Sequence, residues 1–503
     1  MRKHMAKGRV FIIGIDGGTW KVMSPLMEAG RMPALRALAS EGRHGVLAST
    51  IPYITCPAWN TLASGRNPGW IGAFGFLNLA PASYALSYYD YHRDPALPEI
   101  WDILGERGLS CGAFNIPVVR EPRRINGYMI PGFLADERDL HTWPASMRAA
   151  IDAAAGGYVI EPKGFSVMGP EKTIRECEAA MDKRHRVFEA LLSGHPCDFF
   201  LGVFHLADRV SHNLLNHTGL PLEPERGGLH ALTAAFFEKL DGHIGALVER
   251  YVGASDLLMV LSDHGFAPCK SGFLLNNWLI GEGYLKVRSL GGLSGMGINQ
   301  KRIAAALDRV GLLAAASRYA PRSLRRMVPE GRGSGSHASV VDYIQADRVD
   351  WAATRAIALP NHGIYLNTSD RPRGSVGVGG ERESLIKELR RGLEGYVDVA
   401  SGERPVSAVR SREEIYSGPK VDWAPDLMVE MVEGWTTQGV IGDEGRLVLP
   451  LTRADHRREG MIVLRGPGID AGAGDGSIED IAPTVLDFMG VEGPPAMDGK
   501  SLL

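Results

Sequence analysis

Acidic and imidazole side chains stand directly beyond several short apolar runs of this chain. Asp16 follows the apolar run 10–15, and Asp208 and His212 follow the run 199–204. The i, i+4 spacing of Asp208 and His212 would place a carboxylate and an imidazole on one helix face, within reach of one cation. Because ligands of open α/β sheets bind beyond the carboxyl ends of strands, these side chains are candidate metal ligands. A turn aspartate and a surface Asp–His pair are the plainer alternatives.

Two further places offer ligands of the same kind. Asp263 and His264 are adjacent and directly follow the apolar run 257–261. A tight turn there would let both side chains face one cavity, where a hard oxygen and a borderline nitrogen suit zinc or manganese. The alternative is a capping aspartate beside a core histidine. His456, ahead of the run 461–464, is one of fifteen histidines and gains weight only because the other places leave one metal short of a ligand.

The candidate nucleophile is Thr55. A hydroxyl at the start of a helix lies where the helix dipole and free N–H groups favour an anion. An ordinary threonine N-cap, with Pro57 in the first turn, is the alternative. Cys56 lacks the His–Asn pattern of a cysteine nucleophile and is interpreted as a buried thiol. Other hydroxyls nearby could be confused with Thr55: Ser49, Thr50 and Thr61.

The elements that must position these residues follow from the alternation of apolar and amphipathic stretches. The buried runs 10–15, 199–204, 256–261 and 461–464 predict strands, and helical patterns fill 32–40, 99–107 and 173–192. This alternation is typical of an α/β fold with a doubly wound, mostly parallel sheet flanked by helices.

One segment, 286–340, departs from this rhythm. It holds a helical patch, a basic cluster and a Gly/Ser-rich tract at 331–336, so we expect a helical cap or lid insertion there, with a surface excursion of no role as the alternative. Residues 8–285 and 341–503 would then form one catalytic core.

Composition restricts the class of protein. The 503 residues are 45% apolar and 22% charged, with a net charge of −3, and no long basic stripe suggests a nucleic-acid polymer as partner. The five cysteines are scattered, without a CxxC pair, which favours a reducing compartment. Neither a secretory signal nor an apolar run of membrane-spanning length is present. We therefore expect a cytoplasmic enzyme.

Taken in order, these motifs resemble the type I phosphodiesterase/nucleotide pyrophosphatase family of the alkaline phosphatase superfamily. The resemblance is carried by segments spread over nearly the whole chain: 15–18, 55–59 with 64–68, 208–212, 262–266 and 456–460, with lesser similarities at 363–367, 424–427 and 480–484. The resemblance implies an alkaline phosphatase-like fold with two divalent metal ions, zinc or alternatively manganese. One metal ion would be held by Asp208, His212 and His456. The other would be held by Asp16, Asp263, His264 and the Thr55 oxygen.

The resemblance also implies a mechanism. Thr55 would attack phosphorus to give a phospho-threonine intermediate, and the backbone N–H of Cys56 would donate to a phosphoryl oxygen. Nucleotide pyrophosphatases of the family add an asparagine downstream of the nucleophile, but Phe76 stands at that offset here, and Asn78 is the nearest substitute. The expected substrate is a small phosphodiester or pyrophosphate such as a nucleotide, a nucleotide sugar or a phospholipid head group.

Several alternatives remain open on the same scaffold. A phosphomonoesterase would need a cationic clamp for the extra phosphoryl oxygens, for which Arg66, Arg209 and Lys270 are unplaced candidates. A phosphotransferase of the phosphoglycerate mutase type would use serine where Thr55 stands. A sulfatase is disfavoured because threonine cannot become formylglycine. A non-catalytic metal-binding protein on the same fold is the alternative from a different class.

Overall fold

The computed structural model describes residues 8–503 apart from 90–96, 138, 163–168, 289–347, 361, 443–444 and 495–496. The predicted insertion at 286–340 therefore lies outside the described residues except for 286–288, and its proposed role as a lid stays a prediction. None of the described helices combines the length and the apolarity needed to cross a bilayer.

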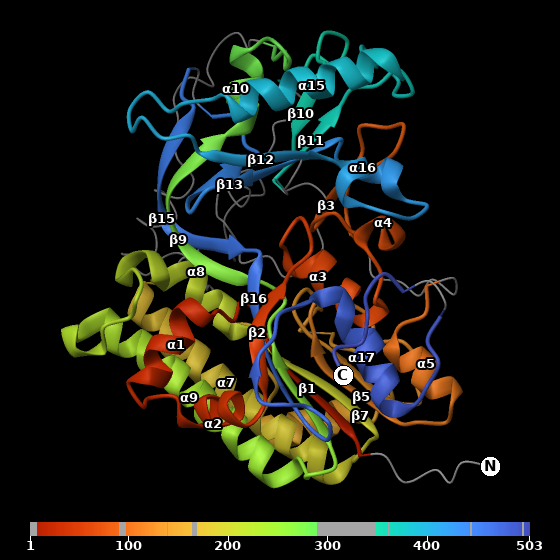
Figure 1. Ribbon diagram of the computed structural model, residues 1–503, viewed down its shortest axis with the longest axis vertical. Helices are drawn as coiled ribbons and strands as arrows, with labels where there is room; N and C mark the ends of the chain where they lie inside the picture. Colours follow the sequence, from red (N-terminus) through yellow and green to blue (C-terminus); the bar gives the residue numbers. More distant parts are fainter. Residues whose placement is uncertain are drawn as a thin grey trace, which may run out of the picture.

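A large sheet runs through the middle of the larger part of the molecule, the lower part in Figure 1. Its strands are β1 (Val10–Ile15), β2 (Arg43–Ala48), β5 (Cys111–Ile116), β6 (Gly127–Pro131), β7 (Phe199–Phe204), β8 (Leu257–Leu261), β16 (Glu459–Arg465), β17 (Gly472–Ala473) and β18 (Gly476–Ser477). They are ordered β17-β2-β16-β8-β1-β7-β5-β6, and β18 also pairs with β2. The five strands from β8 to β6 run parallel, and only β16 runs antiparallel to its neighbours. The expected mostly parallel sheet is confirmed.

Successive side chains of a strand point to opposite faces of the sheet, and here both sets are apolar, which explains why helices cover both faces. In β1, Phe11, Ile13 and Ile15 enter one hydrophobic cluster, whereas Val10 and Ile12 enter another on the opposite face. A strand that buries both faces in this way reads as a continuous apolar run, which is how the sequence presents it.

The helices divide between these two clusters. One face carries α1 (Trp20–Glu28), α2 (Pro33–Glu41), α6 (Met147–Ala155), α7 (Pro170–Gly194), α8 (Leu206–Thr218) and α9 (Gly228–Tyr251). The other carries α3 (Thr55–Ser64), α5 (Ile100–Glu106) and α17 (Ile481–Met489) (Figure 1). The predicted helices at 32–40, 99–107 and 173–192 correspond to α2, α5 and α7 and differ only at their ends.

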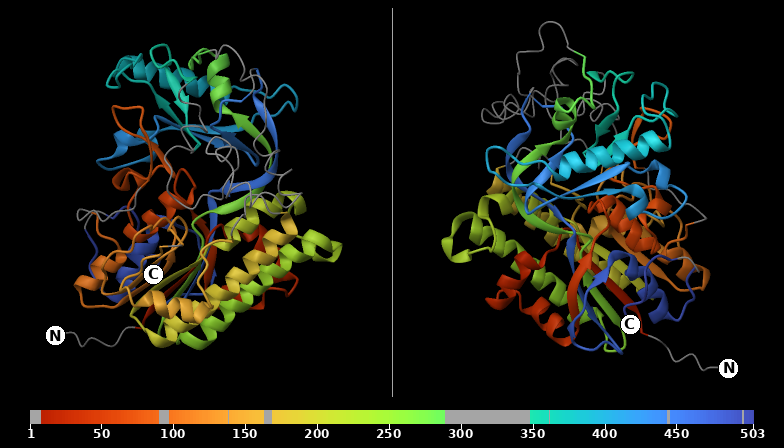
Figure 2. Two further views of the ribbon diagram at one scale, coloured as in Figure 1. Left: turned by 180° about the vertical axis from the view of Figure 1, so that it is seen from behind. Right: turned by 45° about the horizontal axis from the view of Figure 1, so that its top comes forward.

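A smaller lobe stands beyond the carboxyl end of the sheet (Figure 2). It contains the sheet β10-β11-β13-β12, with strands β10 (Ala356–Ala358), β11 (Gly363–Leu366), β12 (Val406–Ser411) and β13 (Leu427–Met431). Helices α10 (Leu275–Gly281) and α15 (Gly380–Glu394) pack with this sheet in a third hydrophobic cluster. The sequence pattern did not separate this sheet from the core, and the predicted core boundaries stay a prediction.

Long strands join the two parts. β9 (Gly265–Leu274) lies between β14 (Gly434–Gln438) and β15 (Val448–Arg457), and β9 and β15 run from the core into the lobe (Figure 1). The remaining described elements are short: β3 (Leu77–Leu79), β4 (Leu86–Tyr88), α4 (Pro68–Ile71), α16 (Arg412–Ile415), and the 3₁₀ helices η2 (Pro224–Arg226), η4 (Val421–Trp423) and η5 (Ile478–Asp480).

Candidate metal centre and nucleophile

Three neighbouring parallel strands deliver four of the candidate ligands. Asp16 directly follows β1, Asp263 and His264 follow β8, and Asp208 lies in the first turn of α8 after β7. Since β8, β1 and β7 are adjacent in the sheet, their carboxyl ends bring these side chains together. The turn after Asp16 requires glycine, because Gly17 has φ of 70° and a Cβ there would lie 2.4 Å from the Phe266 ring.

One group gathers around His264. Its Nε2 lies 3.2 Å from Asp263 Oδ2, 3.7 Å from Asp16 Oδ1 and 3.3 Å from Thr55 Oγ1. The other oxygen of Asp263, Oδ1, accepts the Gly17 N–H at 3.0 Å. All four candidate ligands expected around this metal therefore lie together, and each is buried.

The second group gathers around Asp208. Its Oδ2 lies 3.5 Å from His212 Nε2 and 3.2 Å from His456 Nε2, and the two Nε2 atoms are 2.9 Å apart. His456 arrives on β15, 244 residues after His212. The two groups adjoin, because the His264 and His456 rings stack with centroids 3.7 Å apart.

Backbone carbonyls orient all three imidazoles. The Nδ1 atom faces Ala454 O in His212 at 3.0 Å, Tyr53 O in His456 at 3.1 Å and Gly265 O in His264 at 3.3 Å. Carbonyls only accept, so Nδ1 carries the proton and Nε2 presents a lone pair in each ring. Such second contacts are typical of metal-binding histidines.

The inward-facing atoms are consequently all acceptors. Among the described residues, Asp16 Oδ1, Asp208 Oδ2 and Asp263 Oδ2 are buried and accept no hydrogen bond. Buried carboxylate oxygens facing imidazole lone pairs are unfavourable unless a positive charge lies between them. The donor set of oxygen and imidazole nitrogen fits zinc or manganese.

The pKa values of these side chains reflect their burial and the charges of their neighbours. Burial, with the nearby Asp263 and Asp208, raises the pKa of Asp16 well above its usual range. Burial also raises the pKa of Asp263, to about 7, and lowers that of His264 to about 4. For Asp208, burial is outweighed by His212 and the other cationic or imidazole neighbours, so its pKa falls well below the usual range.

Thr55 is the first residue of α3, and its side chain is buried beside His264. The next backbone N–H, that of Cys56, belongs to the first helical turn, whose N–H groups have no intrahelical carbonyl partner. Burial raises the pKa of the Cys56 thiol well above its usual range, which disfavours a thiolate nucleophile.

The structure distinguishes Thr55 from the other hydroxyls nearby. Thr50 Oγ1 donates to Pro52 O at 2.7 Å, and the buried Ser49 and Thr61 hydroxyls have no hydrogen-bond partner among the described residues. Of these four hydroxyl groups, only that of Thr55 reaches a candidate ligand through a described contact.

The structure does not join Asn78 to this centre through any described hydrogen bond. Asn78 lies in β3, and its buried Oδ1 has no hydrogen-bond partner in the part of the chain that the structure describes. Phe76 packs edge-on against Phe133, with ring centroids 5.8 Å apart. A phosphoryl contact by Asn78 stays a prediction.

Sequence reasoning missed two residues at the centre. Asp455 has a carboxylate oxygen within 4.8 Å of ligand nitrogens of His212 and His456, and its position beside His456 was the available signal. Arg209 donates from Nη1 to Asp208 Oδ1 at 2.8 Å; the sequence suggested it only as an unplaced clamp.

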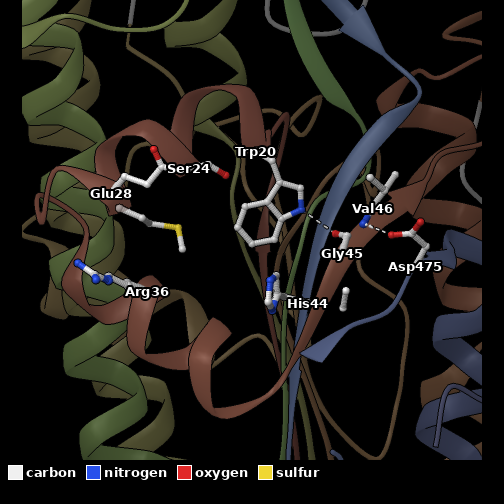
Figure 3. Close-up of a pocket in the computed structure, with 10 residues that line it drawn as sticks. Trp20, Ser24, Glu28, Arg36, His44, Gly45, Val46 and Asp475 are labelled. Carbon is white, nitrogen blue, oxygen red and sulfur yellow. Dashed lines mark hydrogen bonds between the residues drawn. The ribbon is translucent and has the colours of Figure 1, made fainter. Parts of the chain in front are cut away.

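A separate open hollow of about 510 Å³ lies between α1, α2 and β2 (Figure 3). Trp20, Arg36 and His44 are among its lining residues, and Trp20 Nε1 donates to Gly45 O at 2.6 Å. No candidate ligand lines this hollow, so it is distinct from the metal centre.

Similarity to known proteins bears on the family and the fold of this chain. A sequence model of the type I phosphodiesterase/nucleotide pyrophosphatase family matches residues 10–460, whereas no curated protein is significantly similar in sequence. Among solved structures, human ectonucleotide pyrophosphatase/phosphodiesterase 5 is 14% identical with a TM-score of 0.50, covering 98% of this chain and 97% of its own.

Two other similar structures extend this comparison. Phosphonoacetate hydrolase from Sinorhizobium meliloti is 15% identical with a TM-score of 0.52, covering 97% of this chain and 96% of its own. Alkaline phosphatase PafA is 14% identical with a TM-score of 0.53, covering 98% of each chain. At this identity the structural likeness shows the shared fold, and the family match extends it to activity. The chain belongs to the type I phosphodiesterase/nucleotide pyrophosphatase family and is a hydrolase of the phosphodiesterase/nucleotide pyrophosphatase type.

Proposed function

We propose that this enzyme hydrolyses small phosphodiesters or pyrophosphates at a two-cation centre, with Thr55 as the nucleophile. The observation that carries the proposal is the position of Thr55 Oγ1, 3.3 Å from His264 Nε2, beside two adjoining sets of candidate ligands in which three buried carboxylate oxygens accept no hydrogen bond from the described residues. One set is Asp208, His212 and His456. The other is Asp16, Asp263, His264 and Thr55.

Bound divalent cations would polarise the phosphoryl group and stabilise charge on the attacking and leaving oxygens. Thr55 Oγ1 attacks phosphorus while the bond to the first alcohol or phosphate breaks, giving a phospho-threonine. Water then attacks the same phosphorus and releases the Thr55 hydroxyl, which completes a double displacement. The Cys56 N–H at the start of α3 would donate to a phosphoryl oxygen.

A diester or pyrophosphate is favoured over a monoester because the three cationic candidates are engaged or exposed elsewhere. Arg209 is held between Asp208 and Glu161. The Arg66 guanidinium lies over the Trp70 ring at 4.5 Å, and Lys270 is exposed on β9. None of these contacts presents a cationic fork to a transferred phosphoryl group.

The finer assignments belong to the same proposal. We propose zinc as the metal, with manganese as the alternative, because the donors are carboxylate oxygen and imidazole nitrogen. The substrate would be a nucleotide, a nucleotide sugar or a phospholipid head group, acted on in the cytoplasm. The five cysteines are buried and unpaired, which accords with a reducing compartment.

The proposal is tested by hydrolysis of bis-p-nitrophenyl phosphate and p-nitrophenyl phosphate with zinc or manganese. We expect the wild type to prefer the diester and Thr55→Ala to lose at least about 1,000-fold in kcat, since removal of a nucleophile costs several orders of magnitude. Thr61→Ala, the same substitution on the same buried helix, is the matched control and should stay within a few-fold of wild type.

Each contrary result points to a particular error. A preference for the monoester would move the enzyme to the phosphatase alternative. Activity surviving in Thr55→Ala would mean that another group is the nucleophile. Bound metal without turnover of either ester would favour a non-catalytic binding protein.

A further inference from the structure

Arg209 lies behind the candidate ligand Asp208, and its described hydrogen bond with this side chain goes to one of the two carboxylate oxygens. Arg209 Nη1 donates to Asp208 Oδ1 at 2.8 Å. The opposite oxygen, Oδ2, accepts no hydrogen bond from the described residues and faces the Nε2 atoms of His212 and His456 at 3.5 and 3.2 Å. The two oxygens of Asp208 therefore have different surroundings, one bonded to a cationic side chain and one open toward the metal centre.

The guanidinium is itself fixed from two other directions. Arg209 Nε donates to Glu161 Oε1, and the guanidinium carbon lies 4.2 Å from the centroid of the Phe133 ring. A planar fork that meets two carboxylates and stacks on an aromatic ring has little freedom to rotate. Phe133 is held in turn by the edge-on ring of Phe76.

The positive charge of Arg209 explains less of this arrangement than the fixed direction of its hydrogen bond to Asp208 does. Glu161 balances the positive charge of Arg209, so the pair adds no net charge to the centre. A carboxylate with one oxygen engaged by a fixed hydrogen bond can rotate less about its own bond. It then presents the other oxygen as a single ligand atom at a defined place.

We propose that Arg209, held by Glu161 and Phe133, is a positioning residue that fixes Asp208 as a one-oxygen ligand of the metal shared with His212 and His456. This inference rests on the proposed two-metal function. It assigns Arg209 to the metal-binding machinery in place of a phosphoryl clamp. Arg209 donates a hydrogen bond to Asp208, whereas its described influence on Asp16 is electrostatic, so the loss of orientation should fall mainly on one of the two metals.

The test is stepwise metal binding to the full-length enzyme, measured by calorimetric titration of metal-free protein with Zn²⁺ or Mn²⁺ and by metal content after dialysis. Wild type should bind two ions per chain. Arg209→Met should weaken one of the two binding steps by about 10- to 100-fold, as loss of contacts behind a metal ligand typically does. Arg209→Lys, which keeps the charge but not the fork, should recover only part of this loss.

A matched control is Arg123→Met. Arg123 is likewise held between two carboxylates, Glu99 and Asp102, and lies beside the Trp101 ring at 5.7 Å, but none of these residues is a candidate ligand. Its substitution should leave both binding steps unchanged. If circular dichroism shows that Arg209→Met does not fold, Glu161→Gln replaces it in the test. The same single metal-binding step should then weaken by about 3- to 10-fold, because the second carboxylate no longer aligns the Arg209 guanidinium.

The outcomes separate this inference from the function on which it rests. A wild type that binds no metal would refute the two-metal proposal itself. Two bound ions in wild type, with both steps unchanged or equally weakened in the Arg209 variants, would overturn the role of Arg209 alone. Complete recovery by Arg209→Lys would show that charge rather than orientation matters and would also overturn it.

Discussion

Asp263→Asn should stabilise the metal-free protein while weakening the binding of the one metal ion that Asp263 would share with Asp16 and His264. Asp263 is fully buried, with Oδ1 accepting the Gly17 N–H and Oδ2 facing His264 Nε2 at 3.2 Å. An asparagine can keep the first contact with its oxygen. Its Nδ2 would then face the His264 lone pair and donate, so a repulsive contact becomes a hydrogen bond.

The magnitude follows from the pKa of Asp263. Burial raises that pKa from the usual 3.8 to about 7, so the folded state holds a proton that the unfolded state has released between those values. Stability of the metal-free wild type must then fall as pH rises through this window, by about 1.4 kcal/mol per pH unit and about 4 kcal/mol in total. Asparagine carries no charge and avoids this penalty. We expect Asp263→Asn to gain about 2–4 kcal/mol near pH 8 and much less near pH 4.

The measurement is urea unfolding of EDTA-treated wild type and variant at several pH values from about 4 to 8. Asp256→Asn provides a control of opposite sign. Asp256 pairs with Arg9 at 2.9 Å, and although burial opposes it, hydrogen bonds from Gly253 and Arg9 lower its pKa. This carboxylate stabilises the fold above its unfolded pKa, so its removal should destabilise near pH 8. A loss of stability in Asp263→Asn, or a gain that does not change with pH, would refute the reasoning.

Two further substitutions test the surroundings of the centre. Cys56→Ala should keep diester hydrolysis within about 3-fold of wild type, and this activity should remain sensitive to metal removal. The reason is that the buried thiol has a raised pKa and only the backbone N–H of this residue is used. A loss of activity comparable to that of Thr55→Ala would contradict this role. Ser262→Ala should lower the free energy of unfolding by about 1–3 kcal/mol, because the Ser262 hydroxyl donates to Gly18 O and accepts the Met461 N–H, both at 2.8 Å, and its loss leaves buried backbone groups unpaired. Unchanged stability in denaturant unfolding would show that these groups find other partners.

The sequence by itself predicted the central strands and the ligand types. The runs 10–15 and 199–204 coincide with β1 and β7, and the predicted strand 256–261 begins one residue before β8. A strand buried on both faces must be apolar throughout, so a continuous apolar run in the local sequence is enough to predict it. Because the carboxyl ends of parallel strands share one edge, the convergence of Asp16 and Asp263 also followed from the sequence.

Other features depended on which distant segments meet. His456 is placed by β15, whose pairing with β9 sets His456 opposite Phe266, and no local pattern in 448–457 specifies that partner. The smaller lobe was missed for the same reason, since its sheet pairs β11 with β13, two strands that lie far apart in the chain.

The tertiary structure likewise distinguished between side chains that the local sequence left equivalent. Local sequence allowed Thr50, Thr55 and Thr61 as hydroxyl nucleophiles, and only the approach of β8 to α3 placed His264 beside Thr55. Arg209 could have been a clamp, and the positions of Glu161 and Phe133 decided that it lies behind Asp208 instead. Residue types and their periodicity can be taken directly from the sequence. The distance between two side chains depends instead on strand order and packing, which bring together segments that are far apart in the sequence.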